Sequence, residues 1–111
     1  MPYIHKYVIS STKTRSKCVM NEYSKILAKR DEHLRVYTNR MQIIFGKHYI
    51  YHFVSMYQLL RYGDALKVDE WMLDWTCCHF KETDLKRVIE ILHRSFNYEN
   101  YNKRIEKILD E

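Results

Sequence analysis

Residues 3–30 read YIHKYVISSTKTRSKCVMNEYSKILAKR, and this stretch decides the fold that we expect. Tyr3 to Ile9 is rich in aromatic and β-branched residues, which is typical of a β-strand. A polar Ser/Thr/Lys run at 10–17 follows and offers N-cap residues. From Lys17 to about Arg30, apolar residues recur at helical spacing, which predicts a helix. The chain therefore opens with a strand, a polar loop and a helix.

Three more strand-like runs follow, at residues 33–38, 41–45 and 48–55. Gly46-Lys47 separates the last two runs, which predicts a β-hairpin. Residues 57–62 look like one or two helical turns that stop at Gly63-Asp64. The whole chain has two glycines and one proline, so Asn and Asp must serve at several other corners.

The segment 65–75 carries two patterns at once. Its first residues alternate like a buried strand, whereas its apolar residues from Val68 to Trp75 have helical spacing. We expect a strand to about Asp69 that passes directly into a helix. A clear amphipathic helix follows at 85–96, with an N-cap at Thr83 or Asp84, and a second apolar stripe lies at 98–109.

This order of elements predicts helices packed on a mixed sheet. A length of 111 residues fits a single domain, 1–111. We expect the α/β class, with a small central sheet that contains a β-hairpin and with helices on both sides. An α+β domain with an antiparallel sheet is the alternative.

The charges are divided unevenly along the chain. The net charge is +5, but residues 1–50 carry ten Lys and Arg against three Asp and Glu, while residues 51–111 carry nine against eleven. A basic front half predicts a surface that faces a polyanion, although a merely solvated surface is the alternative. Three cysteines, two of them adjacent, are a poor disulfide framework, so we expect reduced thiols in the cytoplasm. We expect neither a membrane span nor a secretory signal.

The strand, polar loop and helix at the start have the chemistry of a phosphate site. A helix N-terminus offers free backbone N–H groups and the positive end of the helix dipole. Lys13 can neutralise phosphate, and the hydroxyl of Thr14 can hold Mg²⁺. Asp69, expected at the end of an adjacent strand, would complete the metal shell, and Glu70 would polarise water. The alternative is that Lys13 lies on a solvated loop and that the acidic pair begins or caps a helix.

Three motifs give the chain a family resemblance: FVS at 53–55, LRYG at 60–63 and ALKVDE at 65–70. Together they resemble the core of P-loop ATPases of the phage terminase and helicase type. In that family a hairpin ends in Phe-x-Ser, an Arg-Gly segment follows, and an apolar strand ends in Asp-Glu. The STKT at 11–14 falls where the phosphate loop of the family would lie. The resemblance covers roughly residues 3–75 and implies a P-loop-like fold, a nucleotide ligand and a viral origin.

Residues 7–17 contain no glycine, although the loop of the family uses glycines so that the backbone can approach phosphate closely. Lys67 also interrupts the apolar strand before Asp69. We therefore expect a degenerate site that binds an anion more than it hydrolyses a nucleotide. The enzyme alternative is a nucleotide-dependent phosphohydrolase, which would hold Mg-nucleotide at Lys13, Thr14, Asp69 and Glu70.

Nucleic-acid binding is the second chemistry that the front half suggests. Basic side chains contact phosphates, and tyrosines on strands can stack on unpaired bases. Strand tyrosines are also common as half-buried sheet residues, which is the alternative for them. The candidate residues are Arg15, Lys17, Arg35, Arg40, Lys47, Tyr49 and Tyr51.

Metal binding and nucleophilic catalysis find no support in the spacing of residues. His48 and His52 face the same side of a strand but lie about 13 Å apart along it. The run Cys77-Cys78-His79 is contiguous, whereas zinc ligands are usually spaced. No Gly-x-Ser-x-Gly turn occurs. We expect no metal site and no catalytic residues.

We therefore expect a small viral or phage accessory protein that binds nucleic acid or a host protein through its basic N-terminal half. The viral origin rests on the resemblance alone. A purely protein-binding inhibitor or adaptor is a further alternative. In that case the Tyr-rich stripe at 98–109 would contact the partner, because tyrosine is favoured at interfaces.

Overall fold

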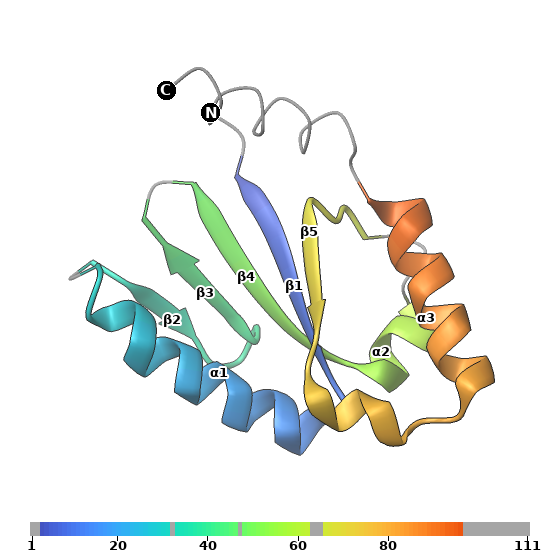
Figure 1. Ribbon diagram of the computed structural model, residues 1–111. Coiled ribbons are helices and arrows are strands. Elements are labelled where there is room, and N and C mark those ends of the chain that lie inside the picture. Colours follow the sequence, from blue (N-terminus) through green and yellow to red (C-terminus); the bar gives the residue numbers. More distant parts are fainter. Residues whose placement is uncertain (1–2, 32, 47, 63–65, 97–111) are drawn as a thin grey trace.

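The computed structural model describes residues 3–31, 33–46, 48–62 and 66–96, which form a mixed sheet with helices on both faces (Figure 1). The α/β prediction is confirmed. In chain order the elements are β1 (Ile4–Ser10), α1 (Lys13–Ala28), β2 (Arg35–Tyr37), β3 (Gln42–Phe45), β4 (Tyr49–Ser55), α2 (Met56–Tyr62), β5 (Glu70–Leu73), the 3₁₀ helix η2 (Trp75–His79) and α3 (Glu82–Ser95).

The strand order β2-β3-β4-β1-β5 places β1 between two parallel neighbours. Along one side, β1 pairs with β4 from Ile4 opposite Tyr49 onward, and along the other it pairs with β5 from Lys6 opposite Glu70. β3 is antiparallel to both of its neighbours, β2 and β4, as the predicted hairpin requires. The carboxyl ends of β1, β4 and β5 therefore open at one edge of the sheet, which we call the carboxyl edge.

Alternation along β1 divides the core into two layers. Val8 faces α1 and packs with Val19 and Phe53. Tyr7 and Ile9 point to the other face, where α2 and α3 cover them. The two layers explain why α1 lies on one side of the sheet and the later helices on the other (Figure 1).

α1 begins at Lys13, whereas the sequence predicted a start at Lys17. Thr12 is the N-cap, and its hydroxyl accepts the backbone N–H of Arg15 at 3.1 Å. The first side chain of α1 that packs against the sheet is Ser16, which is 1% exposed. A periodicity of apolar residues does not count a serine, so the first turn of the helix was read as loop.

The segment 65–75 was predicted wrongly: the helix expected after Asp69 is the strand β5. The backbone N–H of Asp69 donates to the carbonyl of His5 at 3.0 Å, and a carboxylate oxygen of Asp69 accepts the N–H of His5 at 2.8 Å. These bonds hold the chain beside β1, where an extended backbone completes the parallel ladder. Long-range pairing overrides the helical spacing.

α3 begins at Glu82 with Lys81 as its N-cap, so the predicted caps at Thr83 and Asp84 lie inside the helix. Glu82 and Asp84 stand in its first turn, where carboxylates favour the positive end of the helix dipole. Lys47 and the stripe at 98–109 lie outside the described residues. Among the helices that are described, none has the length and apolar character to cross a membrane.

A row of hydrogen-bonded side chains crosses the sheet on the face opposite α1. Nδ1 of His5 lies 2.8 Å from Nε2 of His52, and the amide nitrogen of Gln42 lies 3.3 Å from Nδ1 of His52. When Gln42 donates to Nδ1, neutral His52 carries its proton on Nε2 and donates it to His5. The ring of His52 also stacks on Tyr7, with centroids 4.4 Å apart. Burial, with a contribution from His5, lowers the pKa of His52 to about 4.

Acid should therefore destabilise the fold through His52. An unfolded histidine binds its proton near pH 6.5, whereas folded His52 binds it near pH 4, so stability is lost as the pH falls through this window. The loss approaches about 3 kcal/mol when both pKa values are fully expressed. His52→Phe keeps a ring on Tyr7 and should remove this pH dependence, measured by urea unfolding. The matched control, His48→Phe at an exposed histidine, should retain it, and equal pH dependence in native protein and His52→Phe would contradict the assignment.

Candidate functional site

The chain changes faces of the sheet at the carboxyl edge. After β1 it enters α1 on one face, whereas after the neighbouring strands β4 and β5 it enters α2 and η2 on the opposite face. In open α/β sheets, such a switch point leaves a crevice beyond the carboxyl ends of the strands, and ligands bind there. The topology therefore indicates the carboxyl edge as the place of the functional site.

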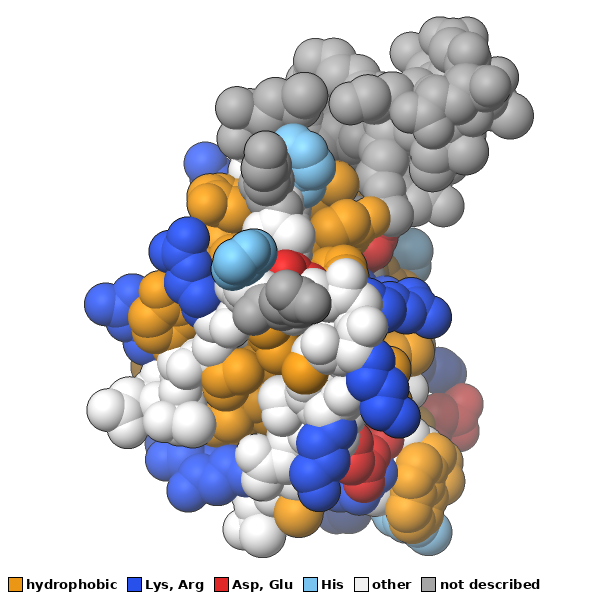
Figure 2. Space-filling view, turned by 90° about the vertical axis from the view of Figure 1, so that its left-hand side faces the viewer, with side chains coloured by type: hydrophobic (Ala, Val, Ile, Leu, Met, Phe, Trp, Pro, Cys, Tyr) orange, Lys and Arg blue, Asp and Glu red, His pale blue; other side chains and the backbone are white. Residues whose placement is uncertain are grey.

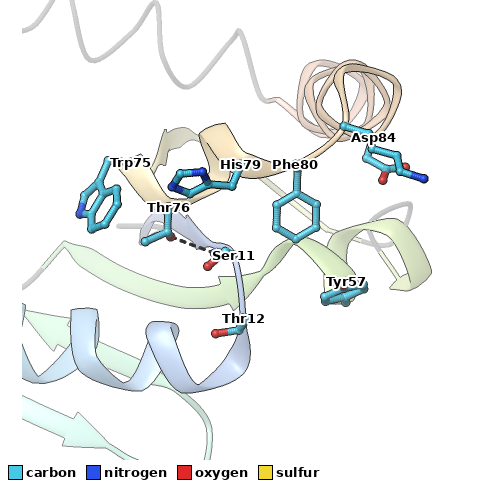
Figure 3. Close-up of a pocket in the computed structure, with 9 residues that line it drawn as sticks. Ser11, Thr12, Tyr57, Trp75, Thr76, His79, Phe80 and Asp84 are labelled. Carbon is cyan, nitrogen blue, oxygen red and sulfur yellow. Dashed lines mark hydrogen bonds between the residues drawn. The ribbon is translucent and has the colours of Figure 1, made fainter.

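A cleft of about 520 Å³ lies at this position, and we call it the carboxyl-edge cleft (Figure 3). Its volume is within the range of about 300 to 1,000 Å³ that is usual for small-molecule sites. The turn after β1, the first residues of α2, the segment after β5 and the start of α3 all contribute to it. Its lining residues are Ser11, Thr12, Tyr57, Trp75, Thr76, His79, Phe80, Lys81 and Asp84.

Aromatic rings stand at both ends of the cleft. Figure 3 shows Trp75 at one end and Tyr57 with Phe80 at the other. Tyr57 and Trp75 are 61% and 66% exposed. Large aromatic side chains are usually more buried than this, and exposed apolar surface often marks a binding site. The rings of Tyr57 and Phe80 meet edge to face, with centroids 5.6 Å apart. The cleft thus offers flat apolar faces to a ligand, with hydroxyls of Ser11 and Thr12 and the ammonium group of Lys81 beside them.

Three hydrogen bonds join the segment after β5 to the end of β1. The backbone N–H of Asp74 donates to the carbonyl of Ile9 at 2.7 Å, and the thiol of Cys77 donates to the same oxygen at 3.3 Å. The N–H of Ser11 donates to the hydroxyl of Thr76 at 3.2 Å. Burial, and then the charge of Asp74, raises the pKa of Cys77 to about 11, so this thiol stays protonated. These bonds fix the two sides of the cleft relative to each other.

Asp74 is the charged centre beneath Trp75. It accepts Nε and Nη2 of Arg15 at 3.0 and 3.3 Å, and the hydroxyl of Thr76 at 2.5 Å. Burial alone would raise the pKa of Asp74, but the hydrogen bonds from Arg15 and Thr76 outweigh burial and lower it. The guanidinium carbon of Arg15 lies 5.6 Å from the ring centroid of Trp75, within cation–π distance. The ion pair of Arg15 with Asp74 therefore packs against one side of the exposed Trp75 ring.

The structure does not bring together the two halves of the predicted phosphate site. Lys13 and Thr14 are exposed in the first turn of α1, just beyond the carboxyl end of β1. Asp69 and Glu70 lie at the amino end of β5, where Glu70 is opposite Lys6 of β1. Because β1 and β5 are parallel, the acidic pair and Lys13 are at opposite edges of the sheet. The expectation that Asp69 ends a strand is wrong, because the chain at Asp69 is only entering β5.

The predicted nucleic-acid residues divide into exposed and enclosed groups. Lys17, Arg35 and Arg40 are exposed, and Arg40 lies over the ring of Tyr37 at 5.6 Å. Tyr51 is 9% exposed and packs in the layer beneath α1, and half-buried Tyr49 packs against the same layer. Tyr51 is therefore part of the core and is not available to stack on bases, whereas the role of half-buried Tyr49 stays a prediction. Arg15 is engaged by Asp74.

Lysines dominate the outer surface of α1. Lys13, Lys17, Lys25 and Lys29 are all exposed, and Glu22 is the sole acidic residue within the helix. Positions 17, 25 and 29 recur at multiples of four and therefore lie along one side of the helix. The helix is about 24 Å long and begins at the cleft, because Thr12 caps it and also lines the cleft. Figure 2 views the molecule from the β2 side. Lys and Arg side chains lie around the margin of that view, and few acidic side chains are seen in it.

In residues 3–31, 33–46, 48–62 and 66–96, no group of three or more His, Cys, Asp or Glu side chains is placed to hold a metal ion. Cys77 is buried, whereas Cys18 and Cys78 are exposed and free.

Sequence reasoning missed most of the cleft. Trp75 was expected in the apolar stripe of a helix that follows Asp69, and Tyr57, Thr76 and Phe80 were not singled out. A signal was present: the apolar run WML at 71–73 ends in Asp74 and is followed by a polar and aromatic stretch. That is the pattern of a strand in a parallel sheet whose carboxyl end opens at a site.

Comparison with protein-family models, with curated proteins and with solved structures finds no match to this chain.

Asp74→Ala should destabilise the protein and loosen the cleft. It removes the acceptor of three side-chain hydrogen bonds and leaves partly buried Arg15 and Thr76 without it, which should cost roughly 1–3 kcal/mol. Glu22→Ala is the matched control, because Glu22 is 3.9 Å from Nη1 of Arg15 and its side chain is 64% exposed. That change should stay within about 0.5 kcal/mol. Urea unfolding of both variants measures the difference, and equal losses would refute the role of Asp74.

Proposed function

We propose that the protein binds single-stranded nucleic acid, with the phosphate backbone along α1 and an unpaired base in the carboxyl-edge cleft. The observation that carries this proposal is the continuity of the two features: the exposed rings of Trp75 and Tyr57 stand at the point where the lysine-bearing helix begins. Proteins that bind single strands combine a positive track for the backbone with aromatic platforms for the bases.

The lysines of α1 supply the track. Their ammonium groups can each neutralise a phosphate, and the release of counterions then drives binding. Lys13, directly after the N-cap Thr12, places a charge next to the cleft, where the positive end of the helix dipole adds to it. A strand that follows α1 would therefore reach the cleft with its backbone already neutralised.

The cleft supplies the platform. Every base has a flat face, so stacking on Trp75 or Tyr57 needs no particular base. A duplex keeps its bases stacked within the helix, whereas an unpaired base can enter a cleft of this size. We therefore assign the ligand as a single strand and make no assignment of DNA or RNA.

A protein partner fits this surface less well. The buried centre of a protein interface is depleted in lysine, whereas the exposed side of α1 is lysine-rich. Nucleotide hydrolysis is also disfavoured, because Lys13 and the acidic pair Asp69-Glu70 lie at opposite edges of the sheet. Neither alternative explains the exposed rings together with the lysines.

Affinity for a labelled single-stranded oligonucleotide should fall steeply as salt is raised from about 50 to 200 mM. Each lysine of α1 that contacts a phosphate should contribute about 0.7 to the slope of log affinity against log salt, so Lys17→Ala and Lys25→Ala should each reduce it by that amount. Lys86→Ala is the control, since Lys86 is an exposed helix lysine on α3, paired with Glu82 at 3.2 Å. Fluorescence anisotropy measures all four proteins. Salt-insensitive binding, no binding, or an equal effect of Lys86→Ala would reject the proposal.

Trp75→Ala should weaken binding by roughly 1–3 kcal/mol, the value of one base stacked on an aromatic ring. The chain has two tryptophans, and Trp71 is half-buried with its ring against His93, so Trp71→Phe is the matched control. In Trp71→Phe the remaining fluorescence comes from Trp75, and an added oligonucleotide should quench it. If quenching is absent there but present in Trp75→Phe, the base does not stack on Trp75.

A further inference from the structure

A second hollow borders Trp75, on the face of the sheet that α1 covers. It has a volume of about 350 Å³ and lies between α1 and β5, and we call it the α1–β5 hollow. Trp75 lines both this hollow and the carboxyl-edge cleft. The volume is at the lower end of the range that is usual for small-molecule sites. The same exposed ring therefore borders two hollows.

The walls of the α1–β5 hollow are apolar and partly exposed. Ile26 of α1 is 54% exposed, and Met72 of β5 is 39% exposed. The ring of Tyr23, which also lines the hollow, packs on Phe53 with centroids 5.4 Å apart, and its hydroxyl lies 4.0 Å from the sulfur of Met72. Unpaired bases are commonly held between aromatic and apolar side chains, and a thioether packs well on an aromatic ring. These walls therefore suit a flat aromatic ligand.

Two carboxylates line the hollow, Glu22 and Asp74. Asp74 already accepts hydrogen bonds from Arg15 and Thr76. The side chain of Glu22 is 64% exposed, and its contact with Nη1 of Arg15, at 3.9 Å, is beyond hydrogen-bond distance. Within the part of the chain that the structure describes, the oxygens of Glu22 therefore remain available to a ligand in the hollow.

The lysines of α1 run beside the same hollow. Residues three apart are neighbours on the surface of a helix, so Lys25 lies beside Glu22 and Lys29 lies beside Ile26. Both lysines are exposed. A strand whose phosphates follow these lysines would pass along the rim of the hollow. This continuity favours a base of that strand as the occupant.

We propose that the α1–β5 hollow holds a second base of the bound strand and that Glu22 selects a base with an exocyclic amino group. This inference rests on the proposed function and adds base selection to it. A carboxylate accepts a hydrogen bond from the N4 amino group of cytosine, whereas uracil and thymine present an acceptor oxygen at that position. Two facing acceptors repel each other. Adenine and guanine also carry amino groups, so the selection is against uracil and thymine.

The test compares labelled oligodeoxycytidine and oligodeoxyuridine of equal length, at one salt concentration, by fluorescence anisotropy. The native protein should bind oligodeoxycytidine about three- to tenfold more tightly, the effect of one hydrogen bond to a charged group that is partly exposed. Glu22→Gln should abolish this preference, because an amide can donate to uracil as well as accept from cytosine. Ile26→Ala removes part of the apolar wall and should weaken the binding of oligodeoxycytidine at least about twofold.

Glu90→Gln is the matched control, because Glu90 is exposed on α3, which covers the opposite face of the sheet. It removes the same charge and should leave the preference unchanged. Salt-dependent binding of both oligonucleotides without a preference would overturn this inference and leave the proposed function standing. So would a preference that survives Glu22→Gln, or one that Glu90→Gln abolishes equally.

Two further results would overturn the inference in other ways. If neither oligonucleotide binds, the proposed function fails and base selection fails with it. If sedimentation equilibrium without oligonucleotide shows a dimer that Ile26→Ala weakens, a second copy of the chain occupies the hollow in place of a base.

Discussion

The pairing of β1 with parallel neighbours on both sides is the constraint on which the rest of the molecule depends. It forces three strand ends from distant parts of the chain, Ser10, Ser55 and Leu73, to open at one edge. Each end must then turn onto a face of the sheet, and β1 alone turns toward α1. The space between these departing segments is the carboxyl-edge cleft. The same parallel direction places the amino ends, with Asp69 and Glu70, at the opposite edge and so separates them from Lys13.

The shortness of the turn after β1 links the cleft to the charged helix. Ser11 and Thr12 are the only residues between β1 and α1, and both line the cleft. Thr12 also caps α1, so a ligand at the cleft meets the start of the helix without any intervening loop. A longer turn would wrap an anion with its own backbone, as glycine-rich loops do. Here the turn is too short for that, so the binding mode that we propose uses the side chains of the cleft and the lysines of α1.

Short-range sequence patterns were enough to predict the first strand, the β-hairpin and the short helix that follows it. The strand before Ser10, the hairpin around Gly46 and the helix after Met56 all follow from β-branched alternation, a turn glycine and short-range spacing. The acidic residue that ends β5 could not be identified in the same way, because Asp69 and Asp74 both follow apolar residues. The choice between them is made by the two hydrogen bonds between Asp69 and His5, residues 64 positions apart. A short window of sequence contains no information on strand pairing between residues so far apart.

The error over Trp75 has the same origin and explains why the cleft was missed. In a helix, Trp71 and Trp75 would lie on one side and be buried together. In the structure the strand ends at Leu73 and a 3₁₀ helix begins at Trp75, so the two rings no longer share a direction. Trp71 is half-buried against His93, while Trp75 stands in the cleft above Arg15 and Asp74. The change from strand to 3₁₀ helix is therefore what exposes the ring of Trp75 at the carboxyl edge of the sheet.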